Sequence, residues 1–364
     1  GEGNGWYLIA SPLAGTITPS EVTNMTSPND FDLYYFDQAQ AKEWVNYKLG
    51  NGNHDTGFGL VSGKGYLYAN QGQVTLTFTG MPYSGDGEVT LTNVEGHRLS
   101  GWNLIGNPWN TTATIGKDFL RMNDDHNEII PAEDENIAPM EGIFVHTDND
   151  GETVAFSTGG AKADFVNERI VLNLSHNGGK VIDRAIVRFG EGSTLPKLQI
   201  RDNSTKLYFT QGNRDYAVVR VNKQDEMPVN FKASENGPYT ITIDIDDVSL
   251  DYLHLIDNLT GNDIDLLATP SYSFNAKTSD YASRFKLVFA VEGENLDSDF
   301  AFVSNGQIII NGQGTVQVID VLGRIITNVE TSYYGVSTKD MVPGIYILRL
   351  INGSDVKTQK IVIE

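Results

Sequence analysis

A stretch of eight residues occurs twice in this chain with five of its eight positions identical, and it constrains the fold more than any other feature. Gly5-Trp-Tyr-Leu-Ile-Ala-Ser-Pro12 returns as Gly101-Trp-Asn-Leu-Ile-Gly-Asn-Pro108. Further apolar segments follow in the same order: 33–36, 43–47, 65–69 and 74–80 after the first copy, and 119–122, 128–130, 142–146 and 153–159 after the second. We therefore predict a duplicated β unit, with repeats at about residues 5–80 and 101–159, packed into one domain over residues 1–163.

Apolar and polar residues alternate in short runs along almost the whole chain, which is the pattern of β-strands. Asn-Gly and Asp-Gly pairs separate many of these runs, and such pairs favour the type I′ turns of β-hairpins. They lie at 86–87, 150–151, 177–178, 311–312 and 352–353. No segment carries a convincing long helical period. The sequence therefore predicts an all-β fold built from consecutive β-sandwich-type domains.

The chain beyond the repeats divides at two polar segments, 160–169 and 292–298, which we interpret as linkers. Eight alternating segments between them predict a two-sheet sandwich over residues 168–292. These segments are 170–174, 184–189, 207–209, 216–221, 239–245, 252–256, 272–274 and 285–289. Residues 297–364 are left for a compact third domain.

Charge and composition exclude several classes of protein. The 47 acidic and 26 basic residues give a formal net charge of −21, so we expect no nucleic-acid partner. The absence of cysteine excludes disulfides, zinc ribbons, iron–sulfur clusters and cysteine nucleophiles. No run of about 18 apolar residues is present, so no membrane span is predicted. The first residues lack the segments of a signal peptide, and we expect a mature or trimmed form of an exported protein.

Catalytic signatures are absent from the sequence. It contains no G-x-S-x-G elbow, no H-E-x-x-H motif and no phosphate-binding loop. A Ser-His-Asp triad or a glycosidase pair of carboxylates assembled from distant residues stays open. Asp244 and Asp246 share one strand face, which we interpret as solvated. We therefore predict no catalytic residue, no cofactor and no enzymatic activity.

Two acidic segments have the composition of a metal site, since calcium loops use alternate oxygen ligands and a glycine. They are Asn123-Asp-Asp-His-Asn-Glu128 and Asp148-Asn-Asp-Gly-Glu152. The corresponding segments of the first repeat carry no such cluster. We therefore interpret both as exposed turns and predict no metal site.

The four tryptophans fall into two pairs. Trp6 and Trp102 occupy the same place in the two repeats, each after a glycine and at the head of an apolar strand, which favours core packing. Trp44 and Trp109 are less constrained by the repeat. They are our candidates for exposed aromatic rings that bind a ligand, because a flat aromatic face stacks on a sugar ring.

The C-terminal segment carries three motifs in a fixed order. An Asp-x-x-Gly-Arg stretch contains Asp320, Gly323 and Arg324, a Pro-Gly-x-Tyr stretch contains Pro343, Gly344 and Tyr346, and the basic-then-apolar end contains Lys360. This combination resembles the C-terminal sorting domain of the Bacteroidetes type IX (Por) secretion system. The resemblance implies a small Ig-like sandwich that interacts with the secretion machinery and directs a folded passenger across the outer membrane. In that family the domain is typically removed while the passenger is attached to the surface or released.

The rest of the chain resembles passenger regions of large Bacteroidetes surface proteins, through the repeats and through segments 252–261 and 280–285. We therefore predict a secreted, non-enzymatic cell-surface protein of the adhesin type, located at the outer membrane, which binds a host matrix protein or a glycan. A carbohydrate-binding or polysaccharide-capture module is the alternative, and an exposed Trp44 or Trp109 on a concave face would favour it. A secreted hydrolase is the third possibility.

Overall fold

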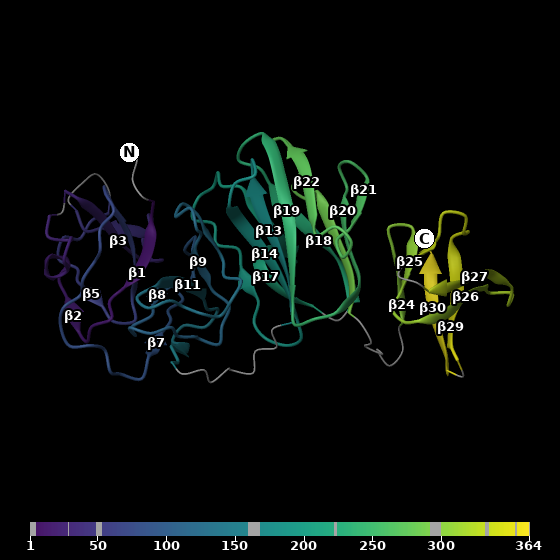
Figure 1. Ribbon diagram of the computed structural model, residues 1–364, viewed down its shortest axis with the longest axis horizontal. Coiled ribbons are helices and arrows are strands. Elements are labelled where there is room, and N and C mark those ends of the chain that lie inside the picture. Colours follow the sequence, from purple (N-terminus) through teal and green to yellow (C-terminus); the bar gives the residue numbers. More distant parts are fainter. Residues whose placement is uncertain are drawn as a thin grey trace.

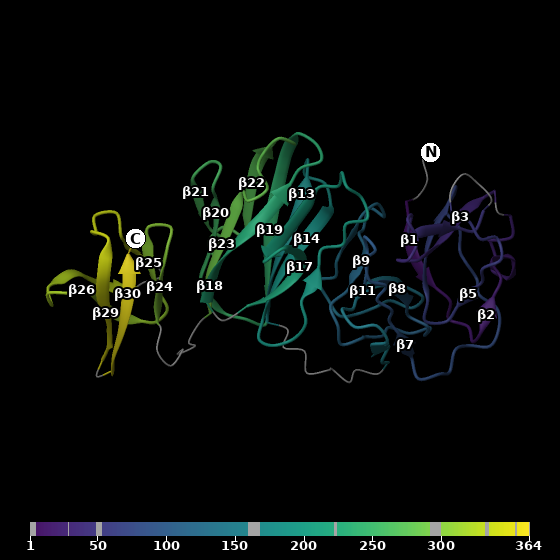
Figure 2. The ribbon, with the colours of Figure 1, turned by 180° about the vertical axis from the view of Figure 1, so that it is seen from behind.

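The computed structural model describes residues 5–27, 29–48, 53–158, 168–221, 224–291, 300–331, 335–353 and 355–363. The only helix among these residues is the short 3-10 helix η1 (Pro19–Glu21), so the prediction of an all-β fold is confirmed. An N-terminal region (5–158), a middle region (168–291) and a C-terminal region (300–363) follow one another along the long axis of the molecule (Figures 1 and 2). The predicted linkers 160–169 and 292–298 lie almost entirely outside the described residues.

The two copies of the repeat form four-stranded antiparallel sheets with the same strand order. The order is β1-β6-β3-β4 in the first copy and β8-β11-β9-β10 in the second, where β1 and β8 carry the repeated sequence. The strands are β1 (Tyr7–Ala10), β3 (Phe31–Phe36), β4 (Trp44–Asn46), β6 (Gly65–Asn70), β8 (Trp102–Gly106), β9 (Leu120–Met122), β10 (Ile129–Pro131) and β11 (Gly142–His146). Matching strands occupy matching positions, as a duplicated unit requires.

The copies contact each other reciprocally. Lys64 forms an isolated β-bridge with Ile105, and the matching residues in the opposite direction, Glu141 and Ile9, form a second bridge. Glycine permits this close approach, because a Cβ added to Gly65 would lie 2.5 Å from the Ile105 carbonyl oxygen. The backbones of the two sheets therefore meet directly beside the repeated strands.

Two short ladders complete the N-terminal region: β2 (Thr16–Ile17) with β5 (Leu60–Val61), and β7 (Glu88–Thr90) with β12 (Thr153–Ala155). The strand expected within 74–80 does not form. Thr77 makes only an isolated bridge with Thr23, although Leu76 and Phe78 pack against the core of the first copy. The alternation of apolar and polar residues correctly predicts that Leu76 and Phe78 face the core. A strand also needs a neighbour with which to form a ladder, and this segment has none among the described residues beyond the single bridge.

The middle region is one hydrogen-bonded sheet that folds over its own core. Its order is β21-β20-β23-β18-β16-β17-β14-β13-β19-β22, with β15 on the edge of β17. Side chains from both halves of this order form a single apolar core, so the sheet encloses it as a sandwich does. The strands are β13 (Arg169–His176), β14 (Val181–Phe189), β15 (Leu195–Pro196), β16 (Lys206–Gln211), β17 (Arg214–Val221), β18 (Gln224–Lys232), β19 (Gly237–Asp246), β20 (Leu250–Asp257), β21 (Asn262–Asp265), β22 (Ser271–Ala276) and β23 (Phe285–Val291).

The C-terminal region is a small sandwich of two sheets, β24-β25-β28 and β27-β26-β29-β30, around its own core, as the predicted Ig-like fold requires. Phe302 and Ile309 pack against apolar side chains of β20 and β23 in the middle region. The strands are β24 (Ala301–Ser304), β25 (Gln307–Ile310), β26 (Gly314–Asp320), β27 (Ile325–Thr331), β28 (Val336–Ser337), β29 (Gly344–Asn352) and β30 (Asp355–Ile363).

The N-terminal and middle regions share a hydrophobic core. It contains Trp102 and Phe144 from the second repeat and Ile186 and Val218 from the middle region. Buried ion pairs join the same two surfaces: Arg188 Nε lies 2.7 Å from Asp118, and the exposed fractions of these side chains are 3% and 5%. The two regions therefore pack as one body, while the predicted division of the chain into domains stays a prediction.

Candidate functional site

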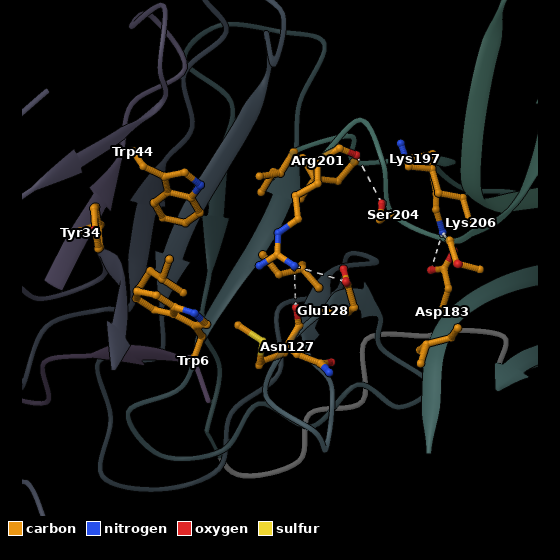
Figure 3. A pocket seen from close by; sticks show the side chains of 17 residues that line it. Trp6, Tyr34, Trp44, Asn127, Glu128, Asp183, Lys197, Arg201, Ser204 and Lys206 are labelled. Carbon is orange, nitrogen blue, oxygen red and sulfur yellow. Dashed lines mark hydrogen bonds and ion pairs between the residues drawn. The ribbon is translucent and has the colours of Figure 1, made fainter. Parts of the chain in front are cut away.

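A pocket of about 460 Å³ lies where the two repeats meet the middle region. Each of the three parts supplies a wall, as the close view shows (Figure 3). The first repeat contributes Trp6, Tyr34, Trp44 and Leu67, the second contributes Met122, Asn127, Glu128 and Ile129, and the middle region contributes Ile182, Asp183, Lys197, Leu198, Ile200, Arg201, Ser204, Thr205 and Lys206. The volume is that of a small-molecule binding site.

Three aromatic rings form one wall of the pocket. Tyr34 lies on β3 and Trp44 begins β4, and the ring centroids are 6.5 Å apart, edge to face. Trp6 stands just before β1, with its ring 5.9 Å from Tyr34. The inner edge of Trp44 packs against Phe36 and Phe144, which holds the indole in place while its other side faces the pocket. All three pocket aromatics are half-buried, so parts of their faces are open to a ligand.

The prediction for the repeated tryptophans is right for one and wrong for the other. Trp102 is 4% exposed and belongs to the core shared with the middle region. Trp6, at the matching position, is half-buried and lines the pocket. The difference follows from the surroundings, because the middle region covers the second copy at this place and leaves the first copy open.

Polar groups form the opposite wall. Arg201 Nη1 donates to the backbone oxygen of Asn127 at 3.3 Å and lies 3.4 Å from Glu128 Oε1. The Arg201 side chain is 58% exposed, so much of the guanidinium is free for further hydrogen bonds. Burial raises the pKa of Glu128, and the charge of Arg201 only partly offsets this effect. A guanidinium, a carboxyl group and a backbone turn therefore face the three rings.

The floor on the middle-region side contains a closed ion pair. Both oxygens of Asp183 accept from Lys197 Nζ at 2.6 Å, and one also accepts from the backbone N–H of Leu207 at 2.7 Å. These side chains are only 5% and 6% exposed. Lys206, the first residue of β16, also lines the pocket and is 7% exposed.

An ion pair with one buried partner joins the two walls: the Glu43 side chain is 6% exposed and that of Arg98 is 47% exposed. Glu43, next to Trp44, accepts from Arg98 Nε at 3.0 Å and Nη2 at 2.9 Å. Arg98 Nη1 then donates to the backbone oxygen of Gln199 at 2.6 Å. Arg98 thus connects the strand of Trp44 to the loop that carries Arg201.

The structure separates the two predicted ligand-binding tryptophans. Trp109 lies outside this pocket, where its Nε1 donates to the Phe156 carbonyl at 3.4 Å and its ring packs edge-on against Tyr83 at 4.9 Å. Of these two tryptophans, Trp44 lines this pocket and Trp109 does not.

Both acidic segments form turns, as predicted: residues 148–151 are exposed, and so are Asp124, Asp125 and Asn127 in the first segment. Asn123 is 3% exposed, and its Oδ1 accepts from the N–H groups of Asn127 and Glu128, which directs Glu128 into the pocket. In the second segment Asp148 pairs with Arg214 at 3.0 Å. Among the described residues no three His, Asp or Glu side chains are grouped as metal ligands. Tertiary packing, which the local sequence does not encode, made the first turn part of the site.

One sequence signal does mark the pocket. In the alignment of the two repeats, Tyr34 corresponds to Leu120 and Trp44 to Ile129. The first copy therefore carries aromatic rings where the second carries aliphatic side chains. A duplicated scaffold needs no such difference for its core, so the excess of aromatics indicates a role of the first copy alone.

The C-terminal motif residues have structural roles in the C-terminal sandwich. The Asp320 carboxylate accepts hydrogen bonds from the backbone N–H and from the side-chain Nε of Arg324. These bonds close the turn between β26 and β27, in which Gly323 has a φ of 80°. The Tyr346 hydroxyl donates to the Val342 carbonyl at 2.7 Å, across the turn formed by Pro343 and Gly344. Lys360 is exposed on β30.

Comparison with known families decides what this sandwich is. Residues 300–364 match the family described as "Secretion system C-terminal sorting domain". The C-terminal region is a type IX sorting domain. The chain is therefore an exported protein that interacts with the secretion machinery and is directed to the cell surface and outer membrane. No helix of the described residues is long and apolar enough to cross a membrane.

The other comparisons add little. No curated protein matches the chain. Among solved structures it is similar to one titled "Biofilm associated protein - BSP domain", at 9% identity and a TM-score of 0.16. That alignment covers 98% of this chain and 62% of the other. The score is too low to support an argument on fold or function.

Proposed function

We propose that this exported chain is a non-enzymatic, adhesin-like surface protein that binds a glycan in the pocket between its repeats and the middle region. The observation that supports the proposal is the pairing of Trp6, Tyr34 and Trp44 with Arg201 and Glu128 across one cavity (Figure 3). Sugar rings present apolar C–H faces and a rim of hydroxyl groups. An aromatic wall facing hydrogen-bonding side chains complements both.

The arrangement of the pocket carboxyl groups supports our proposal of binding rather than hydrolysis. Glycoside hydrolysis needs two carboxyl groups in different roles, one of them often protonated. Both oxygens of Asp183 are already engaged, by Lys197 and by a backbone amide. Glu128 is the remaining carboxyl group of the pocket lining. The pocket thus offers one acid where a glycosidase uses two.

A glycan array and a host-matrix-protein array, probed with the full chain, test the proposal. We expect binding to a subset of glycans, lost in Trp44→Ala and kept in Trp109→Ala, the matched control outside the pocket. Arg201→Ala, at an exposed side chain, is a second variant in case Trp44→Ala unfolds. Binding only to a matrix protein, unaffected by Trp44→Ala and Arg201→Ala, would place the adhesive surface elsewhere. Silence on every glycan would overturn the proposal.

A further inference from the structure

Lys206 is a largely buried lysine whose ammonium group keeps contact with the pocket. Its residue is 7% exposed, yet no hydrogen bond or ion pair of its ammonium group is found among the described residues. A buried charge is costly unless it is paired, so unpaired buried lysines are uncommon. The alternation of β16 explains its direction: Leu207 and Phe209 enter the middle-region core, which leaves Lys206 on the opposite face, at the pocket.

The neighbouring charges do not neutralise Lys206. Lys197 and the Leu207 N–H already occupy the oxygens of Asp183. Lys232 lies opposite Lys206 in the β16–β18 ladder and adds a second positive charge. Burial and the charges of Lys232 and Lys197 lower the pKa of Lys206, while Asp202 and Asp183 raise it by less. The two lysines and two aspartates that act on Lys206 cancel in number, so its own positive charge is left over.

The pocket as a whole is therefore cationic in a strongly acidic protein. Its charged lining consists of three cations, Lys197, Lys206 and Arg201, and two carboxyl groups, Glu128 and Asp183, which leaves an excess of one positive charge. The chain carries a net charge of −21. A cationic pocket in such a chain concentrates anions locally against the overall field.

We propose that the glycan bound by this pocket is acidic, and that its carboxylate or sulfate group pairs with Lys206 and Arg201 while its ring lies against the aromatic wall. The inference rests on the proposed function and adds the chemical class of the ligand. An ammonium group that lines the pocket without a protein partner can pair with an anion that arrives with the ligand. A neutral sugar would leave it unpaired.

The test uses matched pairs of sugars that differ in charge alone. We would measure the binding of oligogalacturonate against its methyl ester, and of 3′-sialyllactose and sulfated lactose against lactose. The full chain is compared with Lys206→Met and Lys232→Met, the second of which makes the same charge change outside the pocket. We expect at least one acidic sugar to bind about ten times or more tightly than its neutral partner. We expect Lys206→Met to remove this preference and Lys232→Met to keep it, since a charge-assisted hydrogen bond contributes about a tenfold to hundredfold affinity difference.

Thermal unfolding supplies an independent readout. Lys206→Met leaves no protein group without its partner, so it is expected to unfold at the same temperature as the parent or higher. A lower midpoint would show that Lys206 has a partner in the free protein and would overturn the inference. Equal binding of acidic and neutral sugars would also overturn it, and the proposed glycan function would remain. If no sugar binds, whether acidic or neutral, both the proposed glycan function and the inference of an acidic ligand are wrong.

Discussion

The buried ion pair of the middle region gives the sharpest prediction for stability. Arg284 and Asp257 are 1% and 0% exposed, with Nη2 to Oδ2 at 2.8 Å and Nε to Oδ1 at 3.1 Å. Arg284→Met keeps most of the side-chain volume and leaves Asp257 with only the Tyr272 hydroxyl and the Leu259 N–H as donors. An uncompensated buried charge of this kind costs about 3–5 kcal/mol. For a body of this size that is roughly 6–20 °C in the melting temperature.

The loss should depend on pH. Burial acts to raise the pKa of Asp257, but hydrogen bonds from Arg284 and Tyr272 outweigh it and hold the pKa below its ordinary value. The parent pair therefore stabilises the fold above about pH 4 and loses this contribution as the pH falls further. Without Arg284, burial dominates and raises the pKa, so the carboxyl group takes up a proton in the folded variant. The difference between parent and variant should shrink as the pH falls from 7 towards 4.

Calorimetry of the full chain at pH 7 and pH 4.5 measures both effects. Lys180→Met is the matched control, because its partner Asp125 and Lys180 itself are 41% and 58% exposed, and such surface pairs contribute about 0–1 kcal/mol. A loss below about 1 kcal/mol in Arg284→Met, or a loss of equal size at both pH values, would refute the argument from burial.

Three further predictions follow from contacts between and within the regions. Gly65→Ala should destabilise the fold by about 1–3 kcal/mol in denaturant titrations, because the added Cβ would lie 2.5 Å from the Ile105 carbonyl oxygen. Gly72→Ala, which has open space around it, should leave the stability unchanged. Equal effects of the two substitutions would contradict the close approach of the copies. The pKa of His146 is lowered to about 4 by burial and Arg214, so the native state should lose about 3 kcal/mol as the pH falls from 6.5 to 4, and His146→Gln should lack this loss. Arg98→Met should weaken glycan binding measured by calorimetric titration, although Arg98 does not line the pocket, because it fixes the loop of Arg201; unchanged affinity would show that the loop holds itself.

Much of the fold follows from local pattern. Each of the eight strands predicted in the middle region forms, because each alternating segment places one face in a core. The strand β18 was not predicted. Its sequence is polar at the start and contains Pro228, which lies beyond the segment of β18 that pairs with β16. Pro228 therefore interrupts the alternating pattern that predicts a strand, but it does not interrupt the pairing of β18 with β16.

The site was only partly predictable. The sequence alone identified Trp44 as a candidate, because this tryptophan is not constrained by the repeat and could therefore serve in ligand binding rather than in the core. Glu128 ends a segment interpreted as a turn, and Arg201 and Lys206 lie between the predicted strands 184–189 and 207–209. They meet Trp44 only because the middle region packs on the second repeat through a shared core. Such contacts depend on long-range packing that leaves no local signal.

The order of the three regions along the molecule has a consequence for how such proteins diversify. The sorting domain contacts the face of the middle region formed by β20 and β23, whereas the pocket is lined by β16 and the loop before it. If the pocket binds the proposed ligand, substitutions that change the ligand fall on a face of the middle region other than the one that contacts the sorting domain. Ligand recognition could then change while the sorting domain and its contact with the middle region stay the same.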